Sequence, residues 1–274
     1  MMKPKAKNIF LWGLAAVITV SLARYQRTTG PTYPLSGKSW LGSQVIKYRL
    51  DRSHEGIGDQ EVRIKVPDET ITGLIIWKRY RLDEPVKVLD LRRQEGWLVG
   101  YLPHQPPSGK LEYRVVLRRG SEQIQLPPTQ PAITRFKGRV PRYYLHPHIL
   151  FMFASLLTAM RAALGAVFTQ RVKPLAWVTM ALVIIGGLVF GPIVQKYAFG
   201  AYWTGWPFGG DWTDNKTAVM VLAWGVALWK LRGKEGEKRG RWWTVAAMVV
   251  MFAMYLIPHS IRGSELDYNK IEQR

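Results

Sequence analysis

The chain has 274 residues, a formal net charge of +20 and no cysteine. The lack of thiols excludes disulfides, thiolate metal sites, iron–sulfur clusters and a cysteine nucleophile. A mean hydropathy of -0.08 conceals two unlike parts, because residues 34–142 are charged and strand-like whereas residues 143–258 contain long apolar runs. The charge suits nucleic acid or an anionic membrane, but the apolar runs favour the lipid bilayer as the partner and not nucleic acid.

The first 27 residues have the layout of a signal peptide or a signal anchor. A lysine-rich start precedes the apolar run 9–23, which is shorter than the roughly 20 residues of a typical span. We favour a transmembrane anchor over residues 1–27, because Trp12 and Tyr25 suit its two interfacial ends. Either alternative leaves the lysines on the cytoplasmic side and places the following domain outside.

Residues 36–128 predict an extracytoplasmic β domain. Apolar and charged residues alternate, most clearly over 61–66 and 111–118, and turn signals recur at intervals of roughly 8–12 residues. This pattern is typical of an antiparallel sandwich or barrel. The domain's basic surface is either simply solvated or faces anionic headgroups.

The segment Pro106–Val115 resembles the turn and penultimate strand of immunoglobulin-like and fibronectin-III-like domains. In this resemblance Tyr113 takes the place of the tyrosine that corners that strand, and Trp77 is expected in the core. The resemblance implies an immunoglobulin-like β-sandwich that binds or spaces other proteins, and it implies no catalytic residues.

The remainder of the chain predicts a membrane bundle. A basic connector over 129–145 leads to a four-span bundle over 146–259, followed by an external tail over 260–274. The spans are expected at about 149–168, 175–194, 218–231 and 242–257. The expected fold class is thus an α+β membrane protein with an N-terminal transmembrane anchor, an extracytoplasmic antiparallel β-sandwich and a C-terminal four-helix transmembrane bundle.

Charge orients these spans. The short loops near Arg171 and over 230–241 are strongly basic, whereas the loop 195–217 carries two lysines and two aspartates. The positive-inside rule then predicts a plasma or inner membrane protein whose N terminus is cytoplasmic and whose β domain and C terminus are outside. Arg161, inside a span, is expected to snorkel toward the inner headgroups, with a paired or cavity-lining role as the alternative.

The loop 195–217 is dense in aromatic residues, which favours a position at the membrane surface or a contact with a partner protein. The expected partner-binding residues are Tyr202, Trp203, Trp206, Phe208 and Trp212. Thr213 and Asp214 directly precede the span that starts near Thr217, so we expect one of them to cap the helix. Asp211 follows two glycines and is expected to form a turn. An acid–base role on a membrane-surface substrate is the alternative.

Histidines near the outer ends of the spans raise the possibility of a cofactor. The candidate metal ligands are His146, His148, His259, Asp211 and Asp214. Nitrogen and oxygen ligands of this kind suit zinc, copper or iron, and His148 with His259 would suit a rim haem. Interfacial histidines also serve as plain polar anchors, and no fixed-spacing metal motif is present in the sequence.

These observations favour a non-enzymatic accessory, assembly or sensing subunit of a larger membrane complex. Other membrane-complex subunits are therefore the expected partners, beside the bilayer itself. The alternative is a membrane protein that binds a metal ion or haem and takes part in electron transfer. Phosphate-binding loops, dinucleotide fingerprints and the Gly-x-Ser-x-Gly elbow are absent from the sequence.

Overall fold

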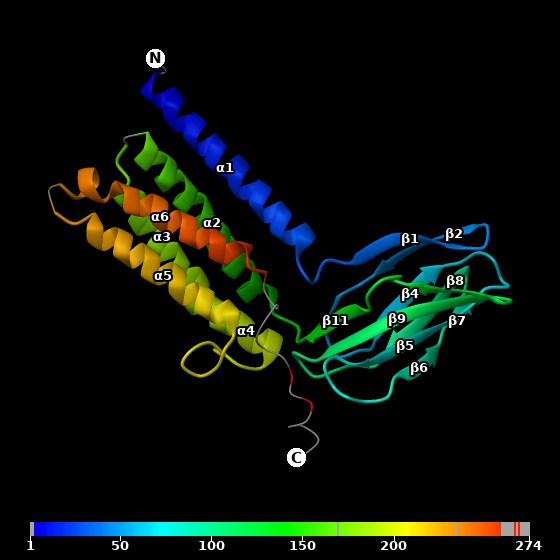
Figure 1. The fold of residues 1–274 in the computed structure, drawn as a ribbon. Coiled ribbons are helices and arrows are strands. Elements are labelled where there is room, and N and C mark those ends of the chain that lie inside the picture. The colour runs from blue at the N-terminus through cyan, green and yellow to red at the C-terminus, as the bar shows by residue number, and fades with distance from the viewer. Residues whose placement is uncertain (1–2, 169, 234, 259–265, 267, 269–274) are drawn as a thin grey trace. The chain divides into compact units, whose positions relative to one another are not determined.

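The computed structural model describes residues 3–168, 170–233, 235–258, 266 and 268. It is a mixed α/β protein that divides into two compact units (Figure 1). Residues 1–30 and 140–264 form a helical unit, whereas residues 31–139 and 265–274 form a unit of β-sheets. The described tail residues Leu266 and Tyr268 thus belong with the sheets and not with the helices that precede them in the chain.

The described residues of the helical unit form five helical segments. In chain order its elements are α1 (Pro4–Thr29), α2 (Arg142–Val167), α3 (Lys173–Val183), the π-helical η1 (Ile184–Phe190), α4 (Gly191–Phe199), α5 (Trp212–Lys230) and α6 (Gly236–Leu256). The elements α3, η1 and α4 follow one another without a break. Among the described residues, three helices are long and apolar enough to cross a membrane, at Lys5–Thr29, Arg142–Val167 and Lys173–Phe199.

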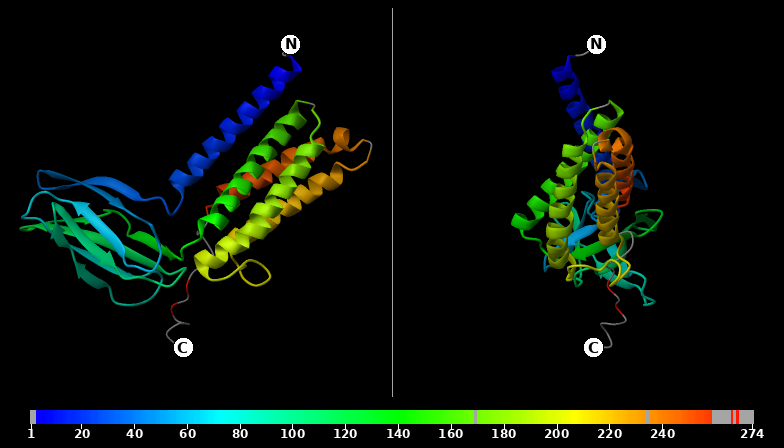
Figure 2. Two further views of the ribbon diagram at one scale, coloured as in Figure 1. Left: turned by 180° about the vertical axis from the view of Figure 1, so that it is seen from behind. Right: turned by 90° about the vertical axis from the view of Figure 1, so that its left-hand side faces the viewer.

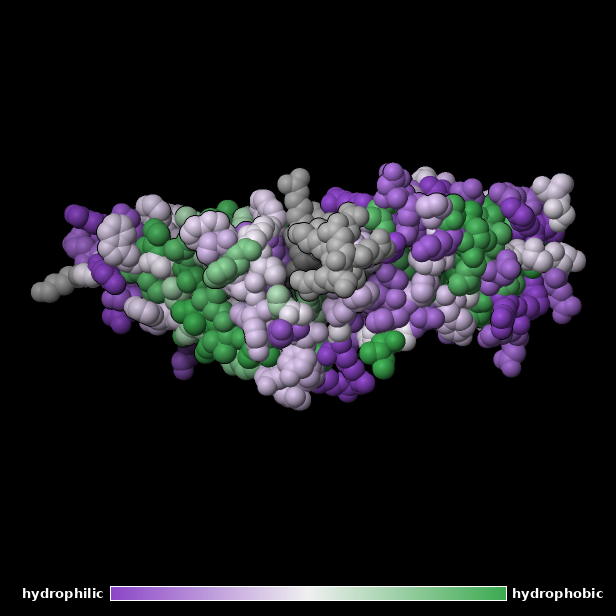
Figure 3. All heavy atoms as spheres, turned by 90° about the horizontal axis from the view of Figure 1, so that it is seen from below, coloured by the Kyte–Doolittle hydropathy of each residue, from purple (hydrophilic) through white to green (hydrophobic). Residues whose placement is uncertain are grey.

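The helices lie side by side around an apolar core (Figure 2). Trp224 is fully buried at its centre and donates its indole N–H to the sulfur of Met251 at 3.2 Å. Outward-facing positions of the same helices are also apolar, and Figure 3 shows a broad hydrophobic surface over this unit, at left. Helices that are apolar both toward their core and on their outer surface suit a lipid bilayer. The expected membrane association is confirmed to this extent, without the number or direction of the crossings.

Two glycines in η1 allow close helix contact. A Cβ atom on Gly186 would lie 2.9 Å from the Cβ of Phe151 in α2, and one on Gly187 would lie 2.7 Å from a methyl group of Thr217 in α5. Only residues without a side chain fit such crossings. The small-residue pair in the sequence therefore marks where α2, η1 and α5 pack.

Residues 35–137 of the β unit form three sheets. Its strands are β1 (Leu35–Leu41), β2 (Gln44–Leu50), β3 (Ser53–Glu55), β4 (Gln60–Lys65), β5 (Thr72–Arg79), β6 (Lys87–Asp90), β7 (Arg92–Gln94), β8 (Trp97–Leu102), β9 (Lys110–Arg119), β10 (Glu122–Leu126) and β11 (Ala132–Lys137). One sheet has the order β3-β11-β9-β5-β6, with β10 also paired to β9. The others are β1-β2 and β4-β8-β7. The β11–β3 pair is parallel and the other recorded pairs are antiparallel.

Strands of all three sheets contribute to one hydrophobic core. Val62 and Ile64 face inward in β4, as the alternation of the sequence predicts. Tyr113 is 1% exposed and donates its hydroxyl proton to the backbone oxygen of Asp51 at 2.9 Å. Burial raises the pKa of the Tyr113 phenol, which keeps it a donor. Trp77 packs at the edge of the core and is only half-buried, beneath the ammonium of Lys87.

Candidate functional site

Four helix ends meet at one end of the helical unit. The ring of Tyr144, at the start of α2, stacks on that of Tyr197, near the end of α4, with centroids 5.6 Å apart. Lys216, at the start of α5, donates to the backbone oxygen of Ile257 just after α6 at 2.8 Å. The loop between α4 and α5, yellow in Figure 1, lies at this end. We call residues 200–211 the aromatic loop.

Asp214 organises the aromatic loop from the inside. Its side chain is 5% exposed and its Oδ2 accepts hydrogen bonds from the backbone N–H groups of Thr204 and Gly205. Gln195 in α4 donates to the same oxygen at 3.0 Å. Hydrogen bonds to a carboxylate are about twice as strong as neutral ones. A single buried carboxylate thus ties the start of the loop to both flanking helices.

Asp211 is the N-cap of α5, earlier in the chain than the cap expected at Thr213 or Asp214, because the helix begins at Trp212. Its Oδ1 accepts from the backbone N–H of Thr213 at 2.7 Å, and its Oδ2 accepts from the hydroxyl of Thr204 at 3.0 Å. The side chain is 3% exposed. Negative charge at this helix end is also favoured by the helix dipole. Both aspartates therefore face inward, toward hydrogen-bond donors of the loop.

The aromatic side chains of the loop face the other way. Trp206 is 77% exposed and Phe208 83%, while Tyr202 in the loop and Trp212 at the start of α5 are exposed to a lesser degree. Trp203 is half-buried and donates its indole N–H to the backbone oxygen of Trp206 at 3.2 Å. The side-chain oxygen of Asn215 accepts from the N–H of Trp206 at 2.8 Å. The loop is thus fixed by its polar groups and presents its aromatic ones.

The histidines occupy separate environments. The ring of His148 is half-buried, with Nδ1 2.8 Å from the backbone oxygen of Gly186 in η1. His146 is exposed on α2. Within the part of the chain that the structure describes, no three His, Cys, Asp or Glu side chains are placed to hold a metal ion together. His259, the third expected histidine, lies outside the described residues.

The opposite end of the helical unit is basic. Lys7 donates to the backbone oxygen of Phe168 at 3.3 Å, where α2 ends. Glu237 in α6 accepts from the backbone N–H groups of Val172 and Lys173, each at 3.0 Å, and so caps the start of α3. The two basic loops and the lysine-rich N terminus therefore gather away from the aromatic loop (Figure 2).

Arg161 points toward this basic end but is not exposed there. Its side chain is 4% exposed, and one terminal nitrogen donates to Asn8 at 2.6 Å and to Gln170 at 2.7 Å. The guanidinium also lies 5.6 Å from the ring centroid of Trp12. Instead of extending to the headgroups as expected, the Arg161 side chain makes contacts that join α1, α2 and the connection between α2 and α3.

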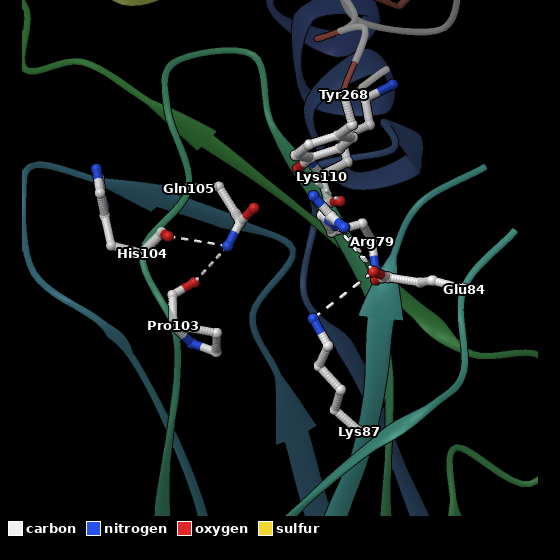
Figure 4. Close-up of polar contacts among 8 residues, drawn as sticks. All are labelled: Arg79, Glu84, Lys87, Pro103, His104, Gln105, Lys110 and Tyr268. Carbon is white, nitrogen blue, oxygen red and sulfur yellow. Dashed lines mark hydrogen bonds and ion pairs between the residues drawn. The ribbon is translucent and has the colours of Figure 1, made fainter. Parts of the chain in front are cut away.

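The tail supplies a contact that the sequence did not suggest. Tyr268 is 7% exposed and rests on the β unit (Figure 4). Its hydroxyl accepts from the backbone N–H of Lys110 at 3.0 Å and donates to the backbone oxygen of the same residue at 3.2 Å. The Arg79 guanidinium lies 5.1 Å from its ring centroid. The backbone N–H of Leu266 donates to Ser108 at 3.3 Å.

An acidic residue holds the arginine beneath the tail. Both Nε and Nη2 of Arg79 donate to one oxygen of Glu84, at 3.0 and 2.8 Å, and the Arg79 backbone N–H donates to the other at 2.7 Å. Lys87 adds a second positive charge 3.6 Å from Glu84 (Figure 4). Burial acts to raise the pKa of Glu84, but the hydrogen bonds and charge of Arg79 outweigh it and lower that pKa.

The packing of Tyr268 depends on a glycine. A Cβ atom on Gly109 would lie 2.9 Å from the Tyr268 hydroxyl and 2.7 Å from the Cβ of Gln105. Burial raises the pKa of Tyr268 to about 12, so the phenol is neutral at ordinary pH. In the sequence, Tyr268 stands out only as an aromatic residue within a polar tail, and this feature does not identify the surface on which the ring packs.

Comparison with known proteins adds little to this description. No protein-family model matches the chain, and no curated protein does. Among solved structures, one match is the crystal structure of chicken CNTN1 FN1–FN3 domains, which is 14% identical and has a TM-score of 0.22. The match covers 35% of this chain and 38% of that chain. It is compatible with the fibronectin-III resemblance of the β unit and does not establish it.

Proposed function

We propose that the protein is a non-catalytic accessory or assembly subunit of a larger membrane complex. It docks a partner membrane protein through the aromatic loop, and its β domain provides a second docking module. The observation that carries this proposal is that polar side chains fix the backbone of the loop while its large aromatic side chains are exposed. Asp211 and Asp214 are buried and accept hydrogen bonds from backbone N–H groups, whereas the side chains of Trp206 and Phe208 are exposed to solvent.

Such an arrangement suits binding more than chemistry. An acid or base must reach a substrate, and these carboxylates instead face backbone N–H groups of their own loop. Large rigid aromatic side chains are the residues that carry most binding energy in protein interfaces. A loop fixed before binding also loses less conformational entropy when the partner arrives.

The proposal includes a topology. The protein would have an N-terminal anchor and a four-helix transmembrane bundle, with the fibronectin-like sandwich and the C terminus outside. The docked tail supports this, because Tyr268 and the β domain must share one side of the membrane and four further helical segments separate them along the chain. An even number of crossings returns a chain to its starting side. The basic end of the helical unit would be cytoplasmic.

Site-specific photo-crosslinking in native membranes tests the docking role. A photoreactive phenylalanine analogue is placed at position 208, with a matched analogue at position 242, where Trp242 is exposed near the basic end. We expect a discrete protein adduct from position 208 that is at least tenfold weaker in Trp206→Ala. Adducts with lipid alone, or equal protein adducts from both positions, would overturn the proposal. So would stoichiometric metal or haem lost on His148→Ala.

A further inference from the structure

Two strand edges in the β unit face each other without pairing. In the described part of the chain β2 pairs with β1 alone, and β4 pairs with β8 alone. Between them lies an open groove of about 700 Å³, lined on one side by residues 47–50 of β2 with the following Asp51, and on the other by residues 61–63 and 65 of β4. An unpaired edge presents backbone N–H and C=O groups that can pair with another extended chain.

The walls of the groove are basic. Lys47 and Arg49 line the β2 side, and Arg63 and Lys65 line the β4 side. The two acidic residues of the groove are each close to an arginine, with Asp51 3.6 Å from Arg49 and Glu61 3.6 Å from Arg63. The two lysines have no such acidic neighbour among the described residues. Positive charge is therefore in excess along both edges.

An aromatic ring lies beneath the β4 wall. The Arg63 guanidinium is 4.9 Å from the ring centroid of Trp97, and the Lys65 ammonium is 6.0 Å from it. Cation–π contacts of this kind hold long side chains near the ring without neutralising their charge. Tyr113, whose hydroxyl is bound to Asp51, closes the base of the groove. The groove thus has a fixed floor and charged rims.

We infer that this groove binds an acidic, extended segment of a partner polypeptide, which adds a strand along the open edge of β4. That edge supplies backbone hydrogen bonds, and the excess positive charge on both walls selects glutamate and aspartate on the incoming strand. A lipid headgroup would satisfy the cations but would leave the backbone groups of the edge unused. The inference deepens the proposed function by giving the β domain a site of its own, separate from the aromatic loop.

Peptide binding to the full chain in mild detergent tests the inference. The probe is a fluorescent hexapeptide of alternating glutamate and valine, measured by anisotropy. We expect binding that weakens with salt, and a loss of about tenfold in Lys47→Glu and in Lys65→Glu, as reversal of a partly exposed charge implies. The matched control is Arg92→Glu, which reverses an exposed charge on β7 of the same sheet as β4 and should bind as the parent does.

Two further probes separate strand addition from simple charge attraction. A peptide of equal charge with proline in place of its valines lacks the backbone N–H at every second residue and cannot pair regularly with a strand edge, so it should bind at least tenfold more weakly. Equal binding by both peptides would overturn the inference. Vesicles of anionic lipid that bind through Lys47 and Lys65 while the peptide does not would overturn it in favour of a headgroup site. None of these outcomes depends on position 208, so the proposed function and this inference can fail separately.

Discussion

Replacing Tyr268 by phenylalanine should loosen the tail while preserving its ring. The substitution removes a hydroxyl that makes two hydrogen bonds to the backbone of Lys110, in a site where the residue is 7% exposed. At about 0.5–1.5 kcal/mol for each bond, docking of the tail should weaken by about 1–3 kcal/mol. The ratio of docked to undocked tail would fall by roughly 5- to 150-fold.

Amide hydrogen exchange measures this directly. The N–H groups of Leu266 and Lys110 are the reporters, because the first donates to Ser108 and the second donates to the Tyr268 hydroxyl. Their exchange should accelerate by the factor given above in Tyr268→Phe. The control is Tyr101→Phe, which removes a hydroxyl from an exposed side chain on β8. Unchanged exchange at both amides would refute the docking argument.

Deprotonation of Tyr268 should have the same consequence as removal of its hydroxyl. The pKa of the docked phenol is raised above its ordinary value of 10.0, to about 12. A raised pKa means that the neutral form is preferred when docked, so the stabilisation is complete below pH 10 and is lost between about pH 10 and 12. Exchange at Leu266, corrected for its intrinsic pH dependence, should rise over that window in the parent chain and not in Tyr268→Phe.

Three further substitutions follow from the contacts. Asp214→Asn should destabilise the aromatic loop by about 1.5–3 kcal/mol, because the charged acceptor of its hydrogen bonds is lost. The melting temperature (Tm) in detergent measures this loss, and an unchanged Tm would contradict the role of the buried carboxylate. Gly186→Val should cost about 1–3 kcal/mol through overpacking against α2, whereas Gly225→Val, whose Cβ would meet only a methionine methyl at 3.9 Å, should leave Tm nearly unchanged. The pKa of Glu84 is lowered, so the stability that this carboxylate contributes is present above its ordinary pKa of 4.5 and is lost as the pH falls below that value. The β unit should therefore lose less stability on acidification in Glu84→Gln than in the parent chain. Equal dependence of stability on pH in the two chains would refute this.

Local patterns were enough to predict much of the architecture. The alternation over 61–66 predicts a half-buried strand because successive side chains point to opposite faces, and β4 shows that burial pattern. The long apolar runs predict helices that face lipid, and three helices among the described residues are both long and apolar enough to cross a membrane. A cap before α5 was predictable because a short polar side chain satisfies the free N–H groups of a helix start, but the cap is Asp211 and not the expected Thr213 or Asp214.

Hydropathy patterns did not predict where the helices begin. The predicted spans end with the apolar residues, but α2 begins at Arg142 and α5 at Trp212, well before them. A helix continues into polar sequence as long as its backbone hydrogen bonds form and no breaker intervenes. Hydropathy marks the part of a helix that suits lipid, and it carries no information on how far the helix extends into water.

Contacts between distant parts of the chain were decided only by the tertiary structure. Tyr268 meets Lys110 across 158 residues of sequence, and nothing in either local pattern specifies that partner. The unpaired edges of β2 and β4 are likewise a property of sheet order and not of either strand alone. Residue types and their spacing determined the alternation of the strands and the apolar helices. The docked tail, the outward aromatic residues of the loop and the basic groove depend on which segments pack together, because side-chain burial is set by neighbours that sequence spacing does not bring close.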